Sequence, residues 1–62
     1  MTFQTTNVFP QSAAFAPEVV ESVIAALDND QFFHHINAGL GGYSITRYSR
    51  ETGLVVGWIA KE

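Results

Sequence analysis

The amino-acid sequence predicts a small α+β fold: an N-terminal strand, one main amphipathic helix, a short second helix and a C-terminal antiparallel β-hairpin. Three observations lead to this fold. Residues 2–9 are rich in Thr, Phe and Val, residues 17–27 carry apolar side chains at helical spacing, and apolar residues flank a turn at 50–53. The 62 residues are expected to form one domain, 1–62.

The N-terminal segment 2–9 favours a strand because its residue types are β-prone, and Pro10 ends it. Its alternation of apolar and polar residues is poor. This strand either adds to the C-terminal hairpin or crosses to a neighbouring subunit.

The main helix is predicted from Pro17 onward. Proline is tolerated at a first helical position, and Glu18 and Glu21 suit the positive end of the helix dipole. The apolar residues that share one face of a 3.6-residue period are Val19, Val20, Val23, Ile24 and Leu27. Residues 28–30 interrupt this pattern.

The segment 31–37 is either a second short helix or a strand. Asp30 is a good helix N-cap and Gly39 a good residue after a helix end, which favours the helix. Projected on a helix, Phe32, Phe33 and Ile36 fall opposite the face of the main helix. We expect these three residues to form an oligomer interface, because one small core does not offer cover for both faces.

The C-terminal hairpin has apolar side chains on both of its faces. A three-residue loop ending on a left-handed Gly53 pairs Thr46 with Trp58, whereas a four-residue loop sets Ile45 against Trp58. Both registers leave large apolar groups on each side, and the chain has only enough helix to cover one side. The excess apolar surface predicts a partner, most simply a second copy of the same chain.

Composition supports the same expectation. The chain is 47% hydrophobic, has eight aromatic residues and only 15% charged residues, and contains no cysteine. A core in a chain below roughly 70–80 residues seldom supplies more than about 3–5 kcal/mol, and disulfides and thiolate metal sites are excluded. Homo-oligomerisation is the remaining way to stabilise so small a domain. With neither an apolar run of membrane length nor the features of a signal peptide, the chain is expected to be cytoplasmic.

No motif indicates catalysis, a cofactor or a metal site. The adjacent His34 and His35 point to different sides of a helix or strand, so we expect one to pack against Phe32 or Phe33 and the other to face solvent. The glycine-rich segment 39–42 lacks the lysine of a phosphate-binding loop. We therefore expect no enzyme activity.

The strongest binding candidates lie in the hairpin. They are Tyr43, Arg47, Tyr48, Arg50 and Trp58, residue types that are enriched at the energetic centres of protein interfaces. They favour a non-catalytic accessory or inhibitory protein that occludes a larger protein partner while itself forming a homo-oligomer. Small chains without cysteine or motifs are often accessory factors of this kind, including those of viruses and plasmids.

Two alternatives remain open at this stage. An oligomer with composite pockets would act as a sponge or sensor, with glycine-turn amides and Arg47 or Arg50 holding an anionic, nucleotide-like ligand. Nucleic-acid binding through the basic hairpin is the second alternative. It is disfavoured because the chain has three Lys and Arg residues in total and a net charge of −3.

Overall fold

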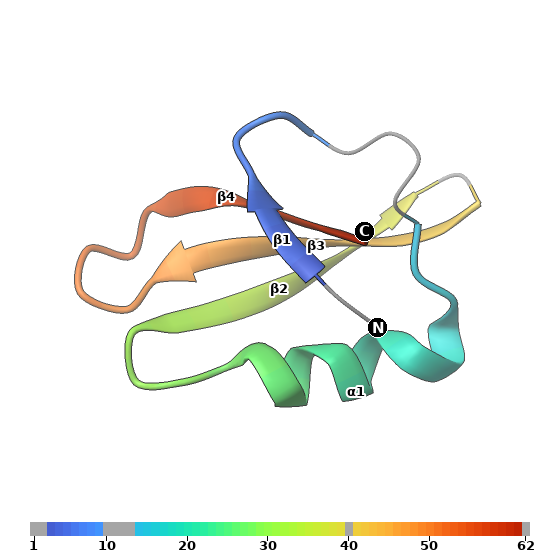
Figure 1. Cartoon of the computed structure of the whole chain (residues 1–62), viewed down its shortest axis with the longest axis horizontal. Coiled ribbons are helices and arrows are strands. Elements are labelled where there is room, and N and C mark those ends of the chain that lie inside the picture. The colour runs from blue at the N-terminus through green and yellow to red at the C-terminus, as the bar shows by residue number, and fades with distance from the viewer. Residues whose placement is uncertain (1–2, 10–13, 40, 62) are drawn as a thin grey trace.

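A computed structural model describes residues 3–9, 14–39 and 41–61. The elements are β1 (Phe3–Thr6), α1 (Pro17–Leu27), β2 (Phe32–Gly39), β3 (Gly42–Ser49) and β4 (Val55–Lys61). The four strands form one antiparallel sheet in the order β1-β4-β3-β2 (Figure 1). The predicted main helix and C-terminal hairpin are confirmed. The predicted N-terminal strand is present, but it spans Phe3–Thr6 and ends at Thr6 instead of continuing to residue 9; Thr2 and Pro10 lie outside the described residues.

The predicted second helix is wrong, because residues 32–39 form β2. The Asn29 side-chain oxygen accepts the backbone N–H groups of Gln31, at 2.8 Å, and Phe32, at 2.9 Å, so the chain turns out of helical geometry there. Asp30, the expected N-cap, starts no helix. β2 instead pairs with β3 along its whole length, and this pairing satisfies backbone groups that a short, isolated helix would satisfy less well.

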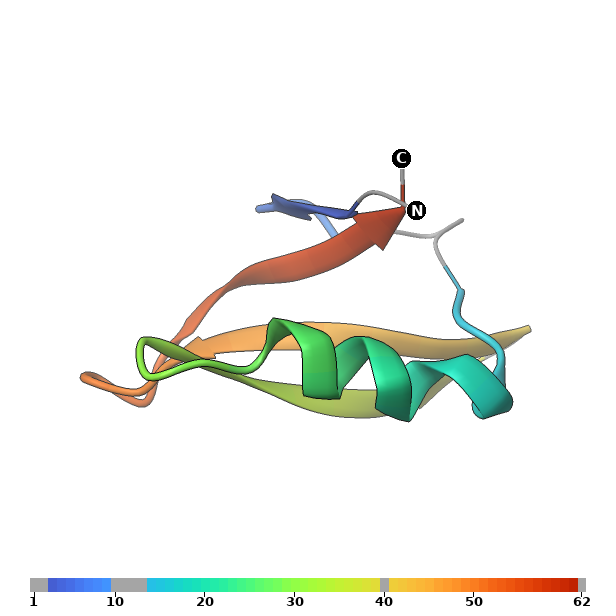
Figure 2. The same cartoon turned by 60° about the horizontal axis from the view of Figure 1, so that its bottom comes forward.

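Helix α1 lies against one side of β2 and β3 (Figure 2). Pro17 stands in its first turn, as predicted. Val20 and Val23 are buried, whereas Val19 is 39% exposed, so the buried stripe is narrower than the periodicity suggests. No helix in the described part of the chain is both long and apolar enough to cross a bilayer.

The β3–β4 hairpin turns through four residues that separate Ser49 from Leu54. The Ser49 N–H donates to the Leu54 carbonyl at 3.0 Å, and Gly53 has a φ of +73°, the left-handed conformation that the sequence predicts. Further along the ribbon Thr46 pairs with Trp58, which is the register expected from the shorter loop.

A β-bulge reconciles the longer loop with that register. Tyr48 pairs with Val55, but the next residue of β3, Arg47, pairs with Gly57. Val56 is therefore an extra residue on β4. A bulge of this kind bends the strand that carries it and increases its twist.

Beyond the bulge β4 diverges from β3. The pairing between them ends at Thr46, and Figure 2 shows β4 rising away from β3 toward its C-terminal end. The segment before α1 enters this opening, where Phe15 exchanges two backbone hydrogen bonds with Tyr43, at 2.7 and 2.9 Å. The Phe15 side chain is only 1% exposed, so it fills the gap between the two strands.

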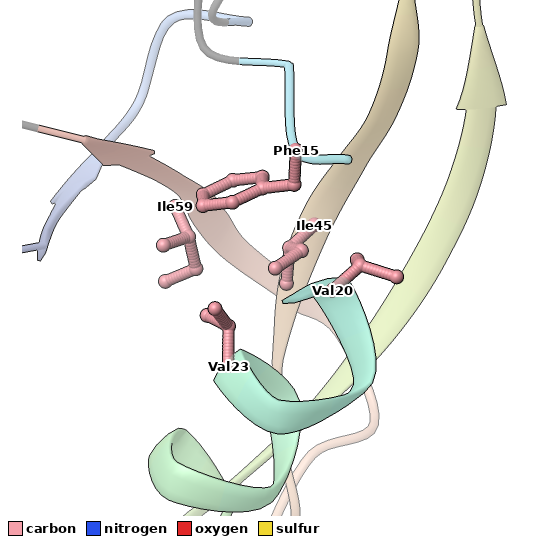
Figure 3. Packing of buried hydrophobic residues seen from close by; sticks show 5 residues of the cluster. All are labelled: Phe15, Val20, Val23, Ile45 and Ile59. Carbon is pink, nitrogen blue, oxygen red and sulfur yellow. The ribbon is translucent and has the colours of Figure 1, made fainter. Parts of the chain in front are cut away.

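The core gathers around Phe15 (Figure 3). The buried members of the core come from the segment before α1, from α1 itself and from the central strands β3 and β4. They are Phe15, Val20, Val23, Ile45 and Ile59. The Phe3 ring packs on Phe15 at 5.9 Å between centroids, and the Lys61 ammonium lies 5.5 Å from the Phe15 centroid. The Phe15 ring thus contacts side chains from both the first strand, β1, and the last strand, β4.

Gly57 allows β1 to close over β4. A Cβ at Gly57 would lie 2.7 Å from both the Thr5 methyl carbon and the Thr6 carbonyl oxygen, and its φ is +157°. The sequence predicts that this glycine makes room for a ring or a close backbone, and the backbone of Thr6 is what it accommodates.

Replacing Gly57 with alanine is expected to destabilise the fold by about 1–3 kcal/mol, because both the close approach of β1 and the positive φ exclude a side chain. Urea denaturation measures the change. Gly39→Ala is the matched control, since a Cβ there meets its nearest atom at 3.9 Å, and it is expected to change stability by less than about 0.5 kcal/mol. Equal losses in the two variants would contradict this account of Gly57.

Candidate functional site

The side of the sheet that faces away from α1, here called the open face, carries a row of large side chains. Phe33 of β2 stacks on Tyr48 of β3 with 5.1 Å between ring centroids and an interplanar angle of 10°. Val55, the partner of Tyr48 on β4, continues the row and is 47% exposed. No helix or strand among residues 3–9, 14–39 and 41–61 covers this face.

Trp58 extends the open face toward β1. It lies beside Thr46, and the ring of Phe9 contacts it edge-on at 5.9 Å between centroids. Thr46 is buried and accepts a 2.6 Å hydrogen bond from the Asn37 amide nitrogen. The polar floor of the face is thus hydrogen-bonded internally, while the aromatic rings above it are partly exposed.

Arg50 stands at one end of the open face. Its guanidinium carbon lies 5.6 Å from the Phe33 ring centroid, and its Nε donates to the Asn29 carbonyl at 2.7 Å. Along the described strands, the residues whose pairing places them on this side include no carboxylate. The face therefore carries aromatic rings and no carboxylate along the described strands, with one arginine at its rim.

The predicted binding residues divide between the two sides of the sheet. Tyr48, Trp58 and Arg50 belong to the open face. Tyr43 and Arg47 lie on the helix side, where Tyr43 packs against the core. The hairpin therefore brings together three of the five candidates on one surface.

The predicted oligomer-interface residues are divided in the same way. Ile36 packs against the core on the helix side, and Phe32 lies on that side under the Arg47 guanidinium, 4.6 Å from its carbon to the ring centroid. Phe33 points to the open face. Helical projection grouped the three residues, whereas a strand separates neighbours by its twofold alternation.

A histidine on the helix side joins the end of α1 to β3. The His34 side chain is fully buried; its Nδ1 lies 2.6 Å from the Asp28 carboxylate, and its Nε2 lies 3.0 Å from Arg47 Nε. Because arginine Nε only donates, Nε2 is the acceptor and the proton is on Nδ1, which donates to Asp28. His35, by contrast, is exposed, so one histidine is buried and the other faces solvent; the buried one is held by Asp28 and Arg47.

The hollow at the turn end of the sheet does not suit an anionic ligand. A hollow of about 340 Å³ at the turn end of the sheet is lined by Asp30, Gln31, Phe32, Ser49 and Glu51, which include two carboxylates and no cation. Gly39 and Gly42 face each other across the β2–β3 turn, and Leu40 lies outside the described residues. Among the described residues, no group of three or more His, Cys, Asp or Glu side chains could hold a metal ion.

Sequence reasoning missed Asp28, Phe9 and Val55 as members of these clusters. The interaction between Asp28 and His34 spans a turn that the sequence interpretation treated as a helix junction. Val55 was not selected because valine is not among the residue types by which Tyr48 was chosen, and its place beside Tyr48 depends on the four-residue turn. Nothing in the sequence pattern connects Phe9 with Trp58, since that contact depends on the path of the chain after β1.

Asp28→Ala is expected to destabilise the protein by about 1–2 kcal/mol, because it leaves the Nδ1–H of the buried His34 without its acceptor. Chemical denaturation measures this loss, and ¹⁵N NMR of the imidazole should show the proton on Nδ1 in the parent protein. Asp30→Ala removes an exposed carboxylate two residues away and serves as the control, with little expected change. A proton found on Nε2 would contradict the assigned hydrogen-bond directions.

No protein-family model, curated protein or solved structure matches this chain. What the molecule does has to be inferred from its own surface. The open face and the His34 cluster differ in one respect that bears on that inference: the His34 side chain is buried and hydrogen-bonded within the chain, whereas the rings of the open face are partly exposed.

Proposed function

We propose that this protein is a non-catalytic binding protein that places its open face against a larger protein and occludes the surface that it covers. One observation carries the proposal. Phe33, Tyr48 and Trp58 lie partly exposed on a sheet face that no described helix or strand covers. Exposed apolar surface of this kind, when contiguous, marks sites of protein association.

The chemistry of the open face suits a protein partner. Tyrosine, tryptophan and arginine bury large areas with little loss of side-chain entropy while keeping a polar group for hydrogen bonding. Tyr48 and Trp58 supply the rings, and Arg50 supplies a cation at the rim, where charge guides association more than it adds affinity. A nucleic-acid partner would require more phosphate contacts than one arginine gives.

The His34 cluster supports the non-catalytic part of the proposal. A general base needs a ring nitrogen that can accept a proton from substrate. In this structure Nδ1 of His34 donates to Asp28, Nε2 accepts from Arg47, and the side chain is fully buried. The cluster therefore resembles a structural tie between the helix end and the sheet.

The proposal includes self-association in the absence of the partner. The small core leaves the open face to be covered, and a second copy can cover it without bringing carboxylates together, since the described strands place none there. We propose the cytoplasm as its compartment, with which a composition free of cysteine is compatible.

A photo-reactive benzophenone side chain placed at Tyr48 is expected to cross-link to protein in cells that express the chain. The same group placed at Val19, which is exposed on the other side of the molecule, is the matched control and should give no specific adduct. Mass spectrometry of the adduct separates a second copy of the chain from a larger partner. Specific adducts from Val19 and none from Tyr48 would assign binding to the helix instead.

Self-association is expected to depend on concentration and to be weakened by Val55→Asp, which puts a charge into the row of the open face. Val19→Asp makes the same change at a valine of similar exposure, 39% against 47%, and should leave assembly unchanged. Sedimentation equilibrium over micromolar to millimolar protein measures both. A parent protein that stays monomeric throughout this range would refute self-association.

A further inference from the structure

β2 is an end strand of the sheet, and half of its backbone groups face away from β3. The Arg50 N–H donates to the Gln31 carbonyl, so Gln31 faces β3, and the next carbonyl, that of Phe32, accepts from Asn29 on the opposite side. Because facing alternates along an antiparallel strand, the N–H and C=O groups of His34, Ile36 and Ala38 point away from β3. No strand among the described residues pairs with this edge.

A hollow of about 380 Å³ runs between this edge and α1. It is lined by Glu21 and Ile24 of the helix and by His34, His35 and Ile36 of β2. His34 and Ile36 point toward the helix and His35 points to the open face, so a hollow that touches all three lies along the strand edge. Figure 1 shows α1 running beside β2, which makes the helix the second wall.

The two walls have a defined chemistry. Ile24 and Ile36 supply an apolar patch, and Glu21, one helical turn before Ile24, supplies an exposed carboxylate. Helix α1 carries Glu18 and Glu21 and contains no lysine or arginine. The pocket thus accepts an apolar side chain and attracts a cation beside it.

The spacing fits an extended chain. Residues three apart on a helix lie about 5–6 Å apart, and alternate residues of a strand, which point to one side, are separated by about 6.6 Å. A strand lying along β2 therefore presents an apolar residue to Ile24 and, two positions away, a lysine or arginine to Glu21. Its backbone meets the outward groups of His34, Ile36 and Ala38.

We propose that β2 and α1 form a second binding site, distinct from the open face, that takes an extended segment of another protein as an added edge strand. The segment carries an apolar residue and a lysine or arginine two positions apart. Addition of a strand to an exposed edge is a recurrent mode of peptide recognition, in which backbone hydrogen bonds give affinity and side-chain pockets give specificity.

The charge of the helix favours a basic segment over a second copy of β2. Antiparallel pairing of two copies through β2 places both helices on the same side of the joint sheet, so that two sets of Glu18 and Glu21 approach each other. Like charges brought together in this way oppose association. A segment with lysine or arginine meets the same carboxylates with opposite charge.

The test uses a fluorescein-labelled decapeptide in which every second residue is threonine and the residues between are alternately valine and lysine. A second peptide has glutamate in place of each lysine. Fluorescence anisotropy is expected to show the lysine peptide binding about fivefold more tightly or better. Glu21→Lys should reverse that preference, whereas Glu51→Lys, an equal charge change in the β3–β4 turn, should preserve it. Amide NMR should show shifts at His34, Ile36 and Ala38.

A second variant tests the backbone bonds. Ala38→Pro removes an N–H that faces away from β3, a change that an edge strand tolerates, and is expected to weaken binding about fivefold or more while the β3 and β4 amide signals persist.

Equal affinity for the two peptides, or shifts confined to Phe33, Tyr48 and Trp58, would overturn the proposal. If the protein forms a dimer without any peptide, and Ala38→Pro dissociates that dimer, then the occupant of the β2 edge is a second copy of the chain and not a basic segment. Each result is independent of the cross-linking at Tyr48.

Discussion

The rest of this structure depends on the insertion of Phe15 between β3 and β4. The two strands separate beyond the bulge, and a sheet that opens in this way exposes its interior unless something fills the gap. Phe15 fills it with a fully buried ring and closes the backbone of β3 through two hydrogen bonds to Tyr43. Ile45, Ile59 and the helix then pack around one side chain (Figure 3). Because that packing occupies the helix side, Phe33, Tyr48 and Trp58, which point the other way, lie outside the core and stay partly exposed.

The elements with local signals were predictable from the sequence. Pro17 and the apolar period that follows it mark α1, and the turn around Gly53 marks the hairpin, because each depends on residues close in sequence. The strand at 31–37 was not predictable from the sequence, because its geometry comes from pairing with β3 and from the Asn29 side chain. Asp30 and Gly39 carry helix-boundary signals of ordinary strength, and the pairing with β3 along the full length of β2 overrides them.

The candidate site was predictable in composition, and in arrangement only as one of two alternative hairpin registers. Tyr48, Trp58 and Arg50 were identified by residue type, and they share a surface. Arg47 has the same residue type, yet one position along the strand turns it to the helix side, where His34 and Phe32 hold it. Which side chains share a face follows from register, and register depends on a bulge that no residue type announces.

The extra residue at Val56 decides what this protein shows to its surroundings. With uninterrupted pairing from Tyr48 and Val55, Trp58 would stand opposite Ile45 inside the core and Ile59 would take its place outside. The inserted valine exchanges the two, so that an isoleucine seals the interior and a tryptophan faces outward. A slip of one position along this hairpin would withdraw the tryptophan, and the same composition would then yield a molecule with no indole to offer a partner.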